Sequence, residues 1–215
     1  MDIPARFESE LDGAVQQGLQ TWGIPGLALA IVKGDQVVLA KGYGVREIGK
    51  PERVDEHTLF AIGSNTKAFT AAGVGLLVQE GKLSWDAPVR EYLPFFALRD
   101  PLASEMMTVR DLLCHRCGLG TWAGDLLLLS NYGSEEVVRR VRHIEPSYPF
   151  RAGYGYCNLM FITAGLLTEA VSGMGWDDFI RERLFLPLGM NESVTSPRLF
   201  DERTNIAAPH EDIEG

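Results

Sequence analysis

Two short apolar segments joined by a polar turn limit the fold of this chain more than any other feature. The stretch "LALAIVKGDQVVLAKGYGV" (residues 27–45) is typical of two β-strands that meet at Gly34-Asp35, a dipeptide suited to a tight hairpin turn. An isolated two-stranded hairpin is only marginally stable in water. Apolar strands such as "LALAIV" and "VVLA" therefore need neighbours, yet no other part of the sequence shows a strand pattern. The chain is expected to contribute two strands to a larger sheet.

Helical patterns lie on both sides of this hairpin. Apolar residues recur at helical spacing over residues 4–22, where Pro4 suits the first helical turn. Beyond residue 59 the pattern is helical, with a capping-box sequence in "TVRD" (108–111) and a glycine suited to end a helix at Gly81. Helices are expected over residues 67–80, 109–113, 134–143 with Ser134 as the N-cap, 159–171 and 176–184. The order of elements predicts a protein of mixed α and β structure.

The composition excludes several classes of partner. A net charge of −9 over 215 residues argues against nucleic acid, because phosphate binding needs clustered Lys and Arg. No apolar run is long enough to cross a bilayer. The N-terminal segment lacks the basic and apolar regions of a secretory signal. We therefore expect a cytoplasmic protein that binds neither nucleic acid nor membrane.

Three cysteines are too few for a disulfide framework. Cys114 and Cys117 form "CHRC", a spacing that occurs in redox pairs and in halves of zinc sites. A zinc site needs a second pair of ligands, and the sequence offers only Cys157 and scattered histidines. The simpler interpretation is that small side chains surround a turn, so neither a metal nor another cofactor is expected.

The segment "AIGSNTKAFT" (61–70) places Ser64 three residues before Lys67, at the expected start of a helix. Side chains one turn apart share a helix face, and the free N–H groups at a helix start favour negative charge. A lysine in an apolar pocket has a lowered pKa and can accept a proton. The pair is therefore a candidate nucleophile and base. The alternative is a serine that caps the helix beside a solvated lysine, because Ser-x-x-Lys is common by chance.

A second candidate motif lies in "FRAGYGYCNLMF" (150–161), where Tyr156 and Asn158 directly precede an apolar helix. A tyrosine whose phenolate is stabilised by a cation can relay a proton between a serine and a leaving group. An asparagine offers both a donor and an acceptor, with which it can orient a lysine and a substrate amide. The alternative interpretation is that Tyr156 belongs to the core and that Asn158 caps the following helix.

Ser-x-x-Lys followed by Tyr-x-Asn at a helix start resembles the serine β-lactamase and penicillin-binding-protein superfamily, above all its class C β-lactamase branch, which includes esterases and D-amino-acid peptidases. The resemblance covers nearly the whole chain, including "GIPGLALAIVKG", "TVRDLLCHRCGLG" and "PLGM". It implies a β-lactamase-like α/β fold, with an antiparallel sheet, flanking helices and an all-helical subdomain. It also implies that Ser64 is the acylated nucleophile, Lys67 its base partner, Tyr156 the proton relay and Asn158 the orienting residue, with a structural role for His115.

One motif of this family is not found in the sequence. The family carries Lys-Thr-Gly or His-x-Gly on a strand well beyond "PLGM", and that strand supplies the second N–H group of the oxyanion hole. The sequence reaches Gly215 before any such motif. Together with the hairpin's need for neighbouring strands, this predicts that strands come from outside these residues, from the rest of a longer protein, from a second polypeptide or from another copy.

The leading hypothesis is a serine hydrolase that forms an acyl-enzyme with an ester or amide, such as a β-lactam or a D-amino-acid peptide. The 215-residue chain alone is expected to be weak or inactive. We expect a helix and hairpin over residues 1–58, a helical subdomain with both motifs over 59–192, and an irregular tail over 193–215. The main rival is a non-catalytic binding or assembly module derived from such a hydrolase, and a more distant one is a thiol-redox protein that uses "CHRC".

Overall fold

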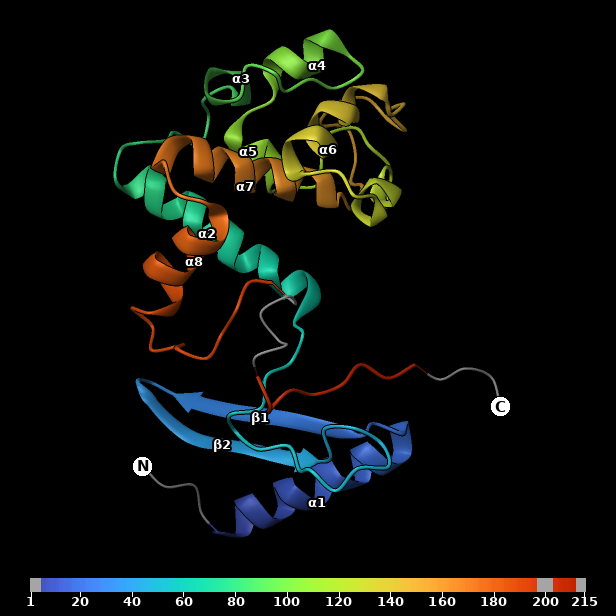
Figure 1. Ribbon diagram of the computed structural model, residues 1–215, viewed down its shortest axis with the longest axis vertical. Coiled ribbons are helices and arrows are strands. Elements are labelled where there is room, and N and C mark those ends of the chain that lie inside the picture. Colours follow the sequence, from blue (N-terminus) through green and yellow to red (C-terminus); the bar gives the residue numbers. More distant parts are fainter. Residues whose placement is uncertain (1–4, 197–202, 212–215) are drawn as a thin grey trace. The chain divides into compact units, whose positions relative to one another are not determined.

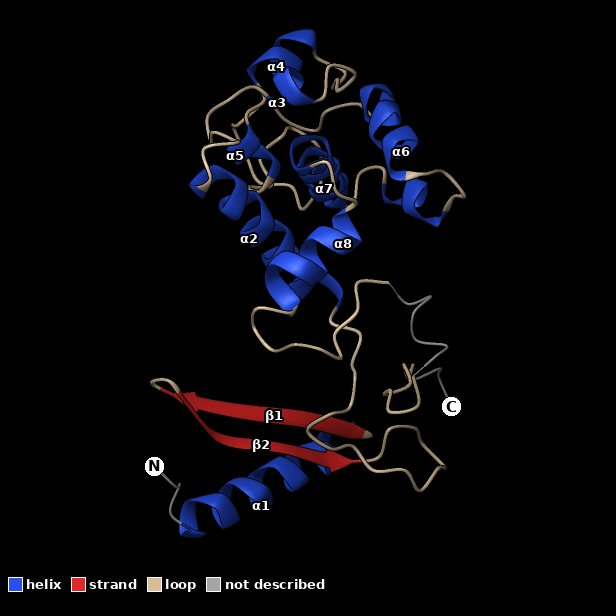
Figure 2. Cartoon of the chain, turned by 60° about the vertical axis from the view of Figure 1, so that its left-hand side comes forward, coloured by secondary structure: helices blue, strands red, loops and turns tan. Residues whose placement is uncertain are grey.

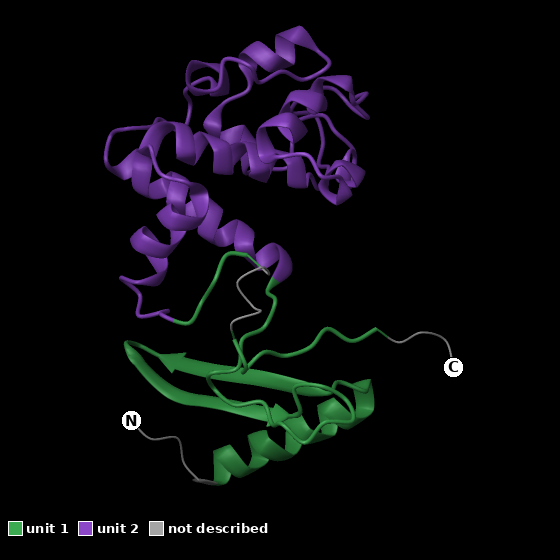
Figure 3. Ribbon diagram, viewed as in Figure 1, with its two compact units in different colours: residues 1–62, 192–215 green, residues 63–191 purple. Residues whose placement is uncertain are grey.

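A computed structural model describes residues 5–196 and 203–211 of the chain, so the expected role of Pro4 lies outside the described residues. The chain divides into two compact units, which Figure 3 shows in different colours. The first comprises Met1–Ile62 and Glu192–Gly215, and the second comprises Gly63–Asn191.

The first unit is a helix packed on an antiparallel hairpin. Helix α1 (Ala5–Trp22) lies along one face of the strands β1 (Gly26–Lys33) and β2 (Gln36–Gly44) (Figure 1). The strands turn at Gly34-Asp35, as predicted, and Gly34 has a φ of +61°, a backbone conformation that glycine adopts without strain.

Asp12 of α1 fixes the helix on the hairpin. The Lys41 ammonium on β2 lies 2.7 Å from its carboxylate, and the Tyr43 hydroxyl donates to the same carboxylate at 2.7 Å. The pKa of Asp12 is lowered by the hydrogen bond from Lys41 and then by the one from Tyr43.

A segment near the end of the chain adds backbone hydrogen bonds that the sequence pattern did not indicate. Leu59 forms a parallel bridge with Ile206, in which the Leu59 N–H donates to Asn205 O and the Ala207 N–H donates to Leu59 O, both at 2.9 Å. The Ala208 N–H donates to the carbonyl of Arg46 at 2.9 Å. These contacts hold residues 205–208 against the loop that follows β2. They do not extend the sheet, which has two strands among the described residues.

The second unit is helical and is built around α7 (Asn158–Ser172), which Figure 2 shows nearly end-on. Leu159, Met160, Ala164 and Leu167 of α7 are fully buried, as expected for an apolar helix enclosed by others. The surrounding α-helices are α2 (Thr66–Gln79), α3 (Val89–Tyr92), α4 (Pro101–Met106), α5 (Val109–Leu112), α6 (Ser134–Arg140) and α8 (Trp176–Ile180). Short segments are the 3₁₀ turns η1 (Gly63–Asn65), η2 (Asp125–Leu129) and η3 (Val141–His143), and the π-helical η4 (Arg181–Phe185).

The helix ends test the expected capping residues. Thr108 and Asp111 form the predicted capping box at α5, and Gly81 follows α2 with a φ of +71°. The expectation for Ser134 was wrong, because Gly133 is the N-cap of α6. The backbone of Gly133 is extended, with φ −69° and ψ 161°, and Ser134 is already helical, so the helix starts one residue earlier than the serine signal indicated.

Asp111 is a buried carboxylate that joins three segments of the second unit. Besides capping α5, it accepts hydrogen bonds from Arg116 at 2.7 Å and from Arg151 at 2.5 Å. Burial alone would raise the pKa of Asp111, but the hydrogen bonds from Arg151, Thr108 and Arg116 outweigh it and lower the pKa to about 2. The ionised carboxylate thereby anchors the loop that leads into Tyr156.

None of the described helices is by itself long and apolar enough to cross a membrane. Helix α7 and the α8–η4 segment reach that length and composition only together, and they are bent by 81° at the break between them.

Candidate active site

Ser64 lies in the 3₁₀ turn η1, immediately before α2, and its side chain is exposed. The N-cap of α2 is Asn65, so Ser64 does not occupy the capping position. Lys67 follows in the first turn of α2 and is half-buried. Its Nζ donates a hydrogen bond to Ser64 Oγ at 3.1 Å. The spacing of three residues therefore brings an ammonium group directly to the serine hydroxyl.

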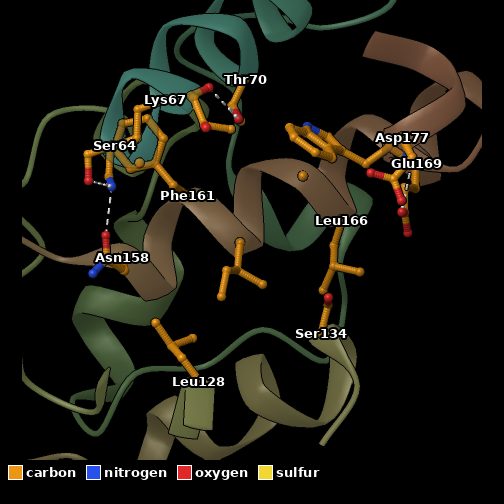
Figure 4. A pocket seen from close by; sticks show the side chains of 15 residues that line it. Ser64, Lys67, Thr70, Leu128, Ser134, Asn158, Phe161, Leu166, Glu169 and Asp177 are labelled. Atoms are coloured by element: carbon orange, nitrogen blue, oxygen red, sulfur yellow. Dashed lines mark hydrogen bonds between the residues drawn. The ribbon is translucent and has the colours of Figure 1, made fainter. Parts of the chain in front are cut away.

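The start of α7 brings Tyr156 and Asn158 to the same place. The Tyr156 hydroxyl and Ser64 Oγ share a hydrogen bond of 2.5 Å, although the two residues are 92 positions apart. Lys67 Nζ donates to Asn158 Oδ1 at 2.6 Å, and Figure 4 shows this bond and the one to Ser64 as dashed lines. The fold thus gathers all four residues singled out in the sequence into one hydrogen-bonded cluster, which we call the Ser64 cluster.

The charge of Lys67 affects the ionisation of Tyr156. Lys67 Nζ lies 4.6 Å from the centre of the Tyr156 ring. The pKa of Tyr156 is lowered from its ordinary value, first by the interaction with Lys67 and then by the hydrogen bond with Ser64. A cation beside a phenol favours the phenolate, so Tyr156 gives up its proton more readily than a tyrosine in water.

His115 supports Tyr156 from the side. The two rings are stacked, with centroids 4.5 Å apart and an interplanar angle of 26°. His115 Nδ1 accepts a hydrogen bond from the backbone N–H of Cys157 at 3.0 Å. The proton of the neutral imidazole is therefore on Nε2. Burial and the charge of Lys67 lower the pKa of His115, so the neutral ring is favoured over the imidazolium.

A pocket of about 540 Å³ opens beside Ser64, Lys67 and Asn158. Its wall is mostly apolar and comes from α7 and its neighbours, with Phe161, Ile162, Leu166, Leu128 and Trp176 among the lining residues. In Figure 4 the carboxylates of Glu169 and Asp177 lie on the side of the pocket opposite Ser64 and Asn158. The nucleophile candidate therefore faces a cavity large enough for a small molecule or part of a peptide.

Sequence reasoning missed Asp125, the first residue of η2. Its Oδ2 accepts a hydrogen bond from Asn158 Nδ2 at 2.7 Å. The available signal was a Gly-Asp pair in "TWAGD" (121–125), between the two motifs. A turn glycine followed by an acidic residue marks a loop, but nothing in that pattern indicates which partner the carboxylate meets.

The cysteines form a different pair from the one that "CHRC" indicates. Cys114 is exposed, Cys117 and Cys157 are buried, and all three are free thiols. A hydrogen bond from Cys157 lowers the pKa of Cys117. Among residues 5–196 and 203–211, no group of three or more His, Cys, Asp or Glu side chains is placed to hold a metal ion.

Comparisons with known proteins agree with this arrangement. The β-lactamase family model matches residues 11–212. An unguisins hydrolase of Aspergillus campestris is 37% identical over 203 residues, which are 88% of this chain and 37% of that protein. Penicillin-binding protein 4 of Amycolatopsis lactamdurans is 35% identical over 178 residues, or 81% of this chain and 45% of that protein. The chain thus spans less than half the length of these two curated relatives.

Solved structures show the same fold. The octameric penicillin-binding protein homologue from Pyrococcus abyssi superposes with a TM-score of 0.79 at 28% identity, over 93% of this chain and 47% of that one. The D-amino acid amidase from Ochrobactrum anthropi superposes with a TM-score of 0.72 at 28% identity, over 92% of this chain and 57% of that one. The fold is β-lactamase-like, as the resemblance implied, and the chain belongs to the β-lactamase family.

Proposed function

We propose that this chain carries the nucleophile and the proton-handling groups of a serine hydrolase that cleaves an ester or amide through an acyl-enzyme on Ser64. One observation carries the proposal: Ser64 Oγ is hydrogen-bonded to both Lys67, at 3.1 Å, and Tyr156, at 2.5 Å, beside an open pocket. A serine is a weak nucleophile until a neighbouring group takes its proton, and here two candidate groups touch the same oxygen.

In the proposed reaction the Ser64 cluster takes the serine proton and then passes it to the leaving group. Ser64 Oγ attacks the acyl carbon while its proton passes to Tyr156, which accepts it as a phenolate stabilised by the Lys67 ammonium. The bond from the acyl carbon to the leaving oxygen or nitrogen then breaks, and the leaving group takes up that proton. Water next attacks the acyl-enzyme, which releases the acid and restores the serine hydroxyl. The lowered pKa of Tyr156 supports the tyrosine as the group that exchanges the proton.

The relatives support a small-molecule or peptide substrate. Those named above include a hydrolase of unguisins, a penicillin-binding protein and a D-amino acid amidase. The pocket beside Ser64 offers an apolar wall in Phe161, Ile162 and Leu166, which suits an apolar acyl or side-chain group. An amide or ester with such a group is the substrate class that we propose.

The test is covalent labelling. A fluorophosphonate should add one phosphonyl group to the 215-residue chain, measured by intact mass, and Ser64→Ala should abolish the addition. An activated ester and a penicillin, applied in the same way, should show which acyl donors the site accepts. Labelling that survives Ser64→Ala would place the nucleophile elsewhere. A folded chain that none of the three reagents modifies would favour the non-catalytic binding or assembly module.

We propose in addition that turnover needs a second oxyanion donor from outside the 215 residues, and that a further strand pairs with the open hairpin. The described residues form a sheet of two strands, which supports this, because an unpaired strand edge is a template for another strand. One missing oxyanion donor costs roughly a hundredfold to a thousandfold in rate. If a second copy delivers the strand, nitrophenyl ester hydrolysis per chain should rise with protein concentration, in step with dimer or higher mass by light scattering. Full turnover by a monomer would contradict the proposal.

A further inference from the structure

We infer that Asp125 is a positioning residue for the Ser64 cluster, and that it fixes the amide of Asn158 so that its oxygen faces Lys67. The inference rests on the proposed function of that cluster. It concerns a residue that neither sequence motif includes. Asp125 comes from the loop between the two motifs, in the turn η2.

The hydrogen bonds of Asn158 define one orientation of its amide. Its Oδ1 accepts from Lys67 Nζ at 2.6 Å, and its Nδ2 donates to Asp125 Oδ2 at 2.7 Å. A carboxylate only accepts and an ammonium only donates. A flipped amide would place its oxygen against the carboxylate and its NH₂ group against the ammonium, and both contacts would be repulsive. Asp125 and Lys67 together therefore exclude the flipped state.

The loop that carries Asp125 is tied to the start of α7 at two further points. The Tyr156 N–H donates to Thr121 Oγ1 at 3.2 Å, and the Trp122 N–H donates to the Tyr156 carbonyl at 3.0 Å. Gly124, with a φ of +81°, lies so close to α7 that a Cβ there would come within 2.7 Å of Leu159 Cδ1. The carboxylate is thus held in register with both Tyr156 and Asn158.

A purely structural role explains Asp125 poorly. Its Oδ1 is buried and has no hydrogen-bond partner among the described residues. A buried polar atom left unpaired destabilises the folded state. An unpaired buried polar atom in a native structure therefore needs a reason other than stability, and the neighbouring Ser64 cluster offers one. Replacing Asp125 should therefore reduce the reactivity of Ser64 more than it lowers the melting temperature.

The inference is tested by a double-mutant cycle on the labelling rate. Asp125→Ala should slow fluorophosphonate labelling of Ser64 by about tenfold to a hundredfold, since misplacing a reacting group by about 1 Å has effects of that size. Asp125→Asn, which keeps an acceptor but permits both amide orientations, should lose less. In an Asn158→Ala background, Asp125→Ala should have little further effect, because its partner is already absent. The matched control is Asp178→Asn, which changes an exposed carboxylate on α8. Ser64 in this variant should be labelled at the wild-type rate.

A second measurement does not depend on reactivity. The side-chain NH₂ signals of Asn158, identified by their loss in Asn158→Asp, should be shifted and protected from hydrogen exchange in the wild type. Asp125→Ala should abolish both effects, and Asp178→Asn should retain them. If wild-type Ser64 is not labelled at all, the proposed function fails and the NMR result alone decides the inference. Unchanged labelling in Asp125→Ala, additive effects with Asn158→Ala, or NH₂ signals unaffected by Asp125→Ala would overturn it.

Discussion

The imidazole of His115 stacks on the phenol of Tyr156 at a centroid distance of 4.5 Å while its Nδ1 accepts the N–H of Cys157. One side chain therefore fixes both the ring of Tyr156 and the backbone of the next residue. His115 is not one of the four residues of the Ser64 cluster, so a change at His115 alters the support of Tyr156 without removing a group that handles the proton.

His115→Ala should reduce both stability and reactivity. The Cys157 N–H would lose its acceptor, which costs about 1–3 kcal/mol in the free energy of unfolding, and Tyr156 would lose a ring that restricts it. His115→Phe restores a ring for stacking but not the acceptor, so it should recover labelling of Ser64 more than stability. Urea denaturation and fluorophosphonate labelling measure the two effects. Equal recovery of both by phenylalanine would show that the hydrogen bond contributes little.

The same residue should make stability depend on pH. The pKa of His115 is lowered in the folded state, so below about pH 6.5 the unfolded chain binds a proton more readily than the folded chain. The free energy of unfolding should therefore fall as the pH drops through 6.5 toward the folded pKa. His115→Phe should remove this part of the slope. A slope that is identical in wild type and His115→Phe between pH 5 and 7.5 would show that another group causes it.

Lys67→Arg should reduce labelling of Ser64 nearly as much as Lys67→Ala. Arginine keeps the positive charge but does not give up a proton at accessible pH, and its planar group does not match the hydrogen bonds that the Lys67 ammonium makes to Ser64 and Asn158. Positioned acid–base groups contribute about a hundredfold or more. Near-normal labelling in Lys67→Arg would mean that lysine acts only through its charge. The effects of single and double changes at Lys67 and Tyr156 should fall short of additivity.

Tyr156 should ionise at a lower pH than Tyr43 and Tyr148. Lys67 and Ser64 lower its pKa, whereas burial raises the pKa of Tyr43 and Tyr148. The difference between the ultraviolet titrations of wild type and Tyr156→Phe should show the ionisation of Tyr156. In Lys67→Met this ionisation should move to higher pH, because the neighbouring cation is gone. A titration curve that is the same in wild type and Lys67→Met would contradict the assignment.

Asp111→Asn should destabilise the second unit by about 3 kcal/mol, because it leaves Arg116 and Arg151 without their shared carboxylate. The wild-type carboxylate has a folded pKa of about 2, below the ordinary value. The contribution of this carboxylate to the free energy of unfolding is therefore complete above about pH 4. It is lost as the pH falls from about 4 toward 2. Acid denaturation followed by circular dichroism should show a shallower loss of stability in the variant. An equal acid transition in both proteins would show that other carboxylates dominate.

Local patterns in the sequence predicted the elements whose cause is local. The hairpin turn at Gly34-Asp35 and the capping box of Thr108 and Asp111 follow from the preferences of neighbouring residues. Ser134 was misplaced by one position because serine and glycine both suit an N-cap, and only the backbone angles of Gly133 separate them.

Local sequence patterns did not predict the contacts between distant segments. Leu59 meets Ile206 through a single bridge, which leaves no periodic signal in either segment. Asp125 meets Asn158 across 33 positions, and its partner is decided by the way η2 packs on α7. Within the Ser64 cluster, each motif could be recognised separately, but their hydrogen bonds depend on how α2 packs against α7.

The distance of 92 positions between Ser64 and Tyr156 has a consequence for biosynthesis. A ribosome that has released only the first 150 residues has already made Ser64 and Lys67, but not the phenol or the amide that complete their surroundings. Under the proposed chemistry the serine of such a nascent chain is an ordinary alcohol, and it acquires its reactivity only when α7 has been synthesised and has docked on α2. Pulse-labelling of arrested chains of increasing length would therefore report the order in which the helical unit folds.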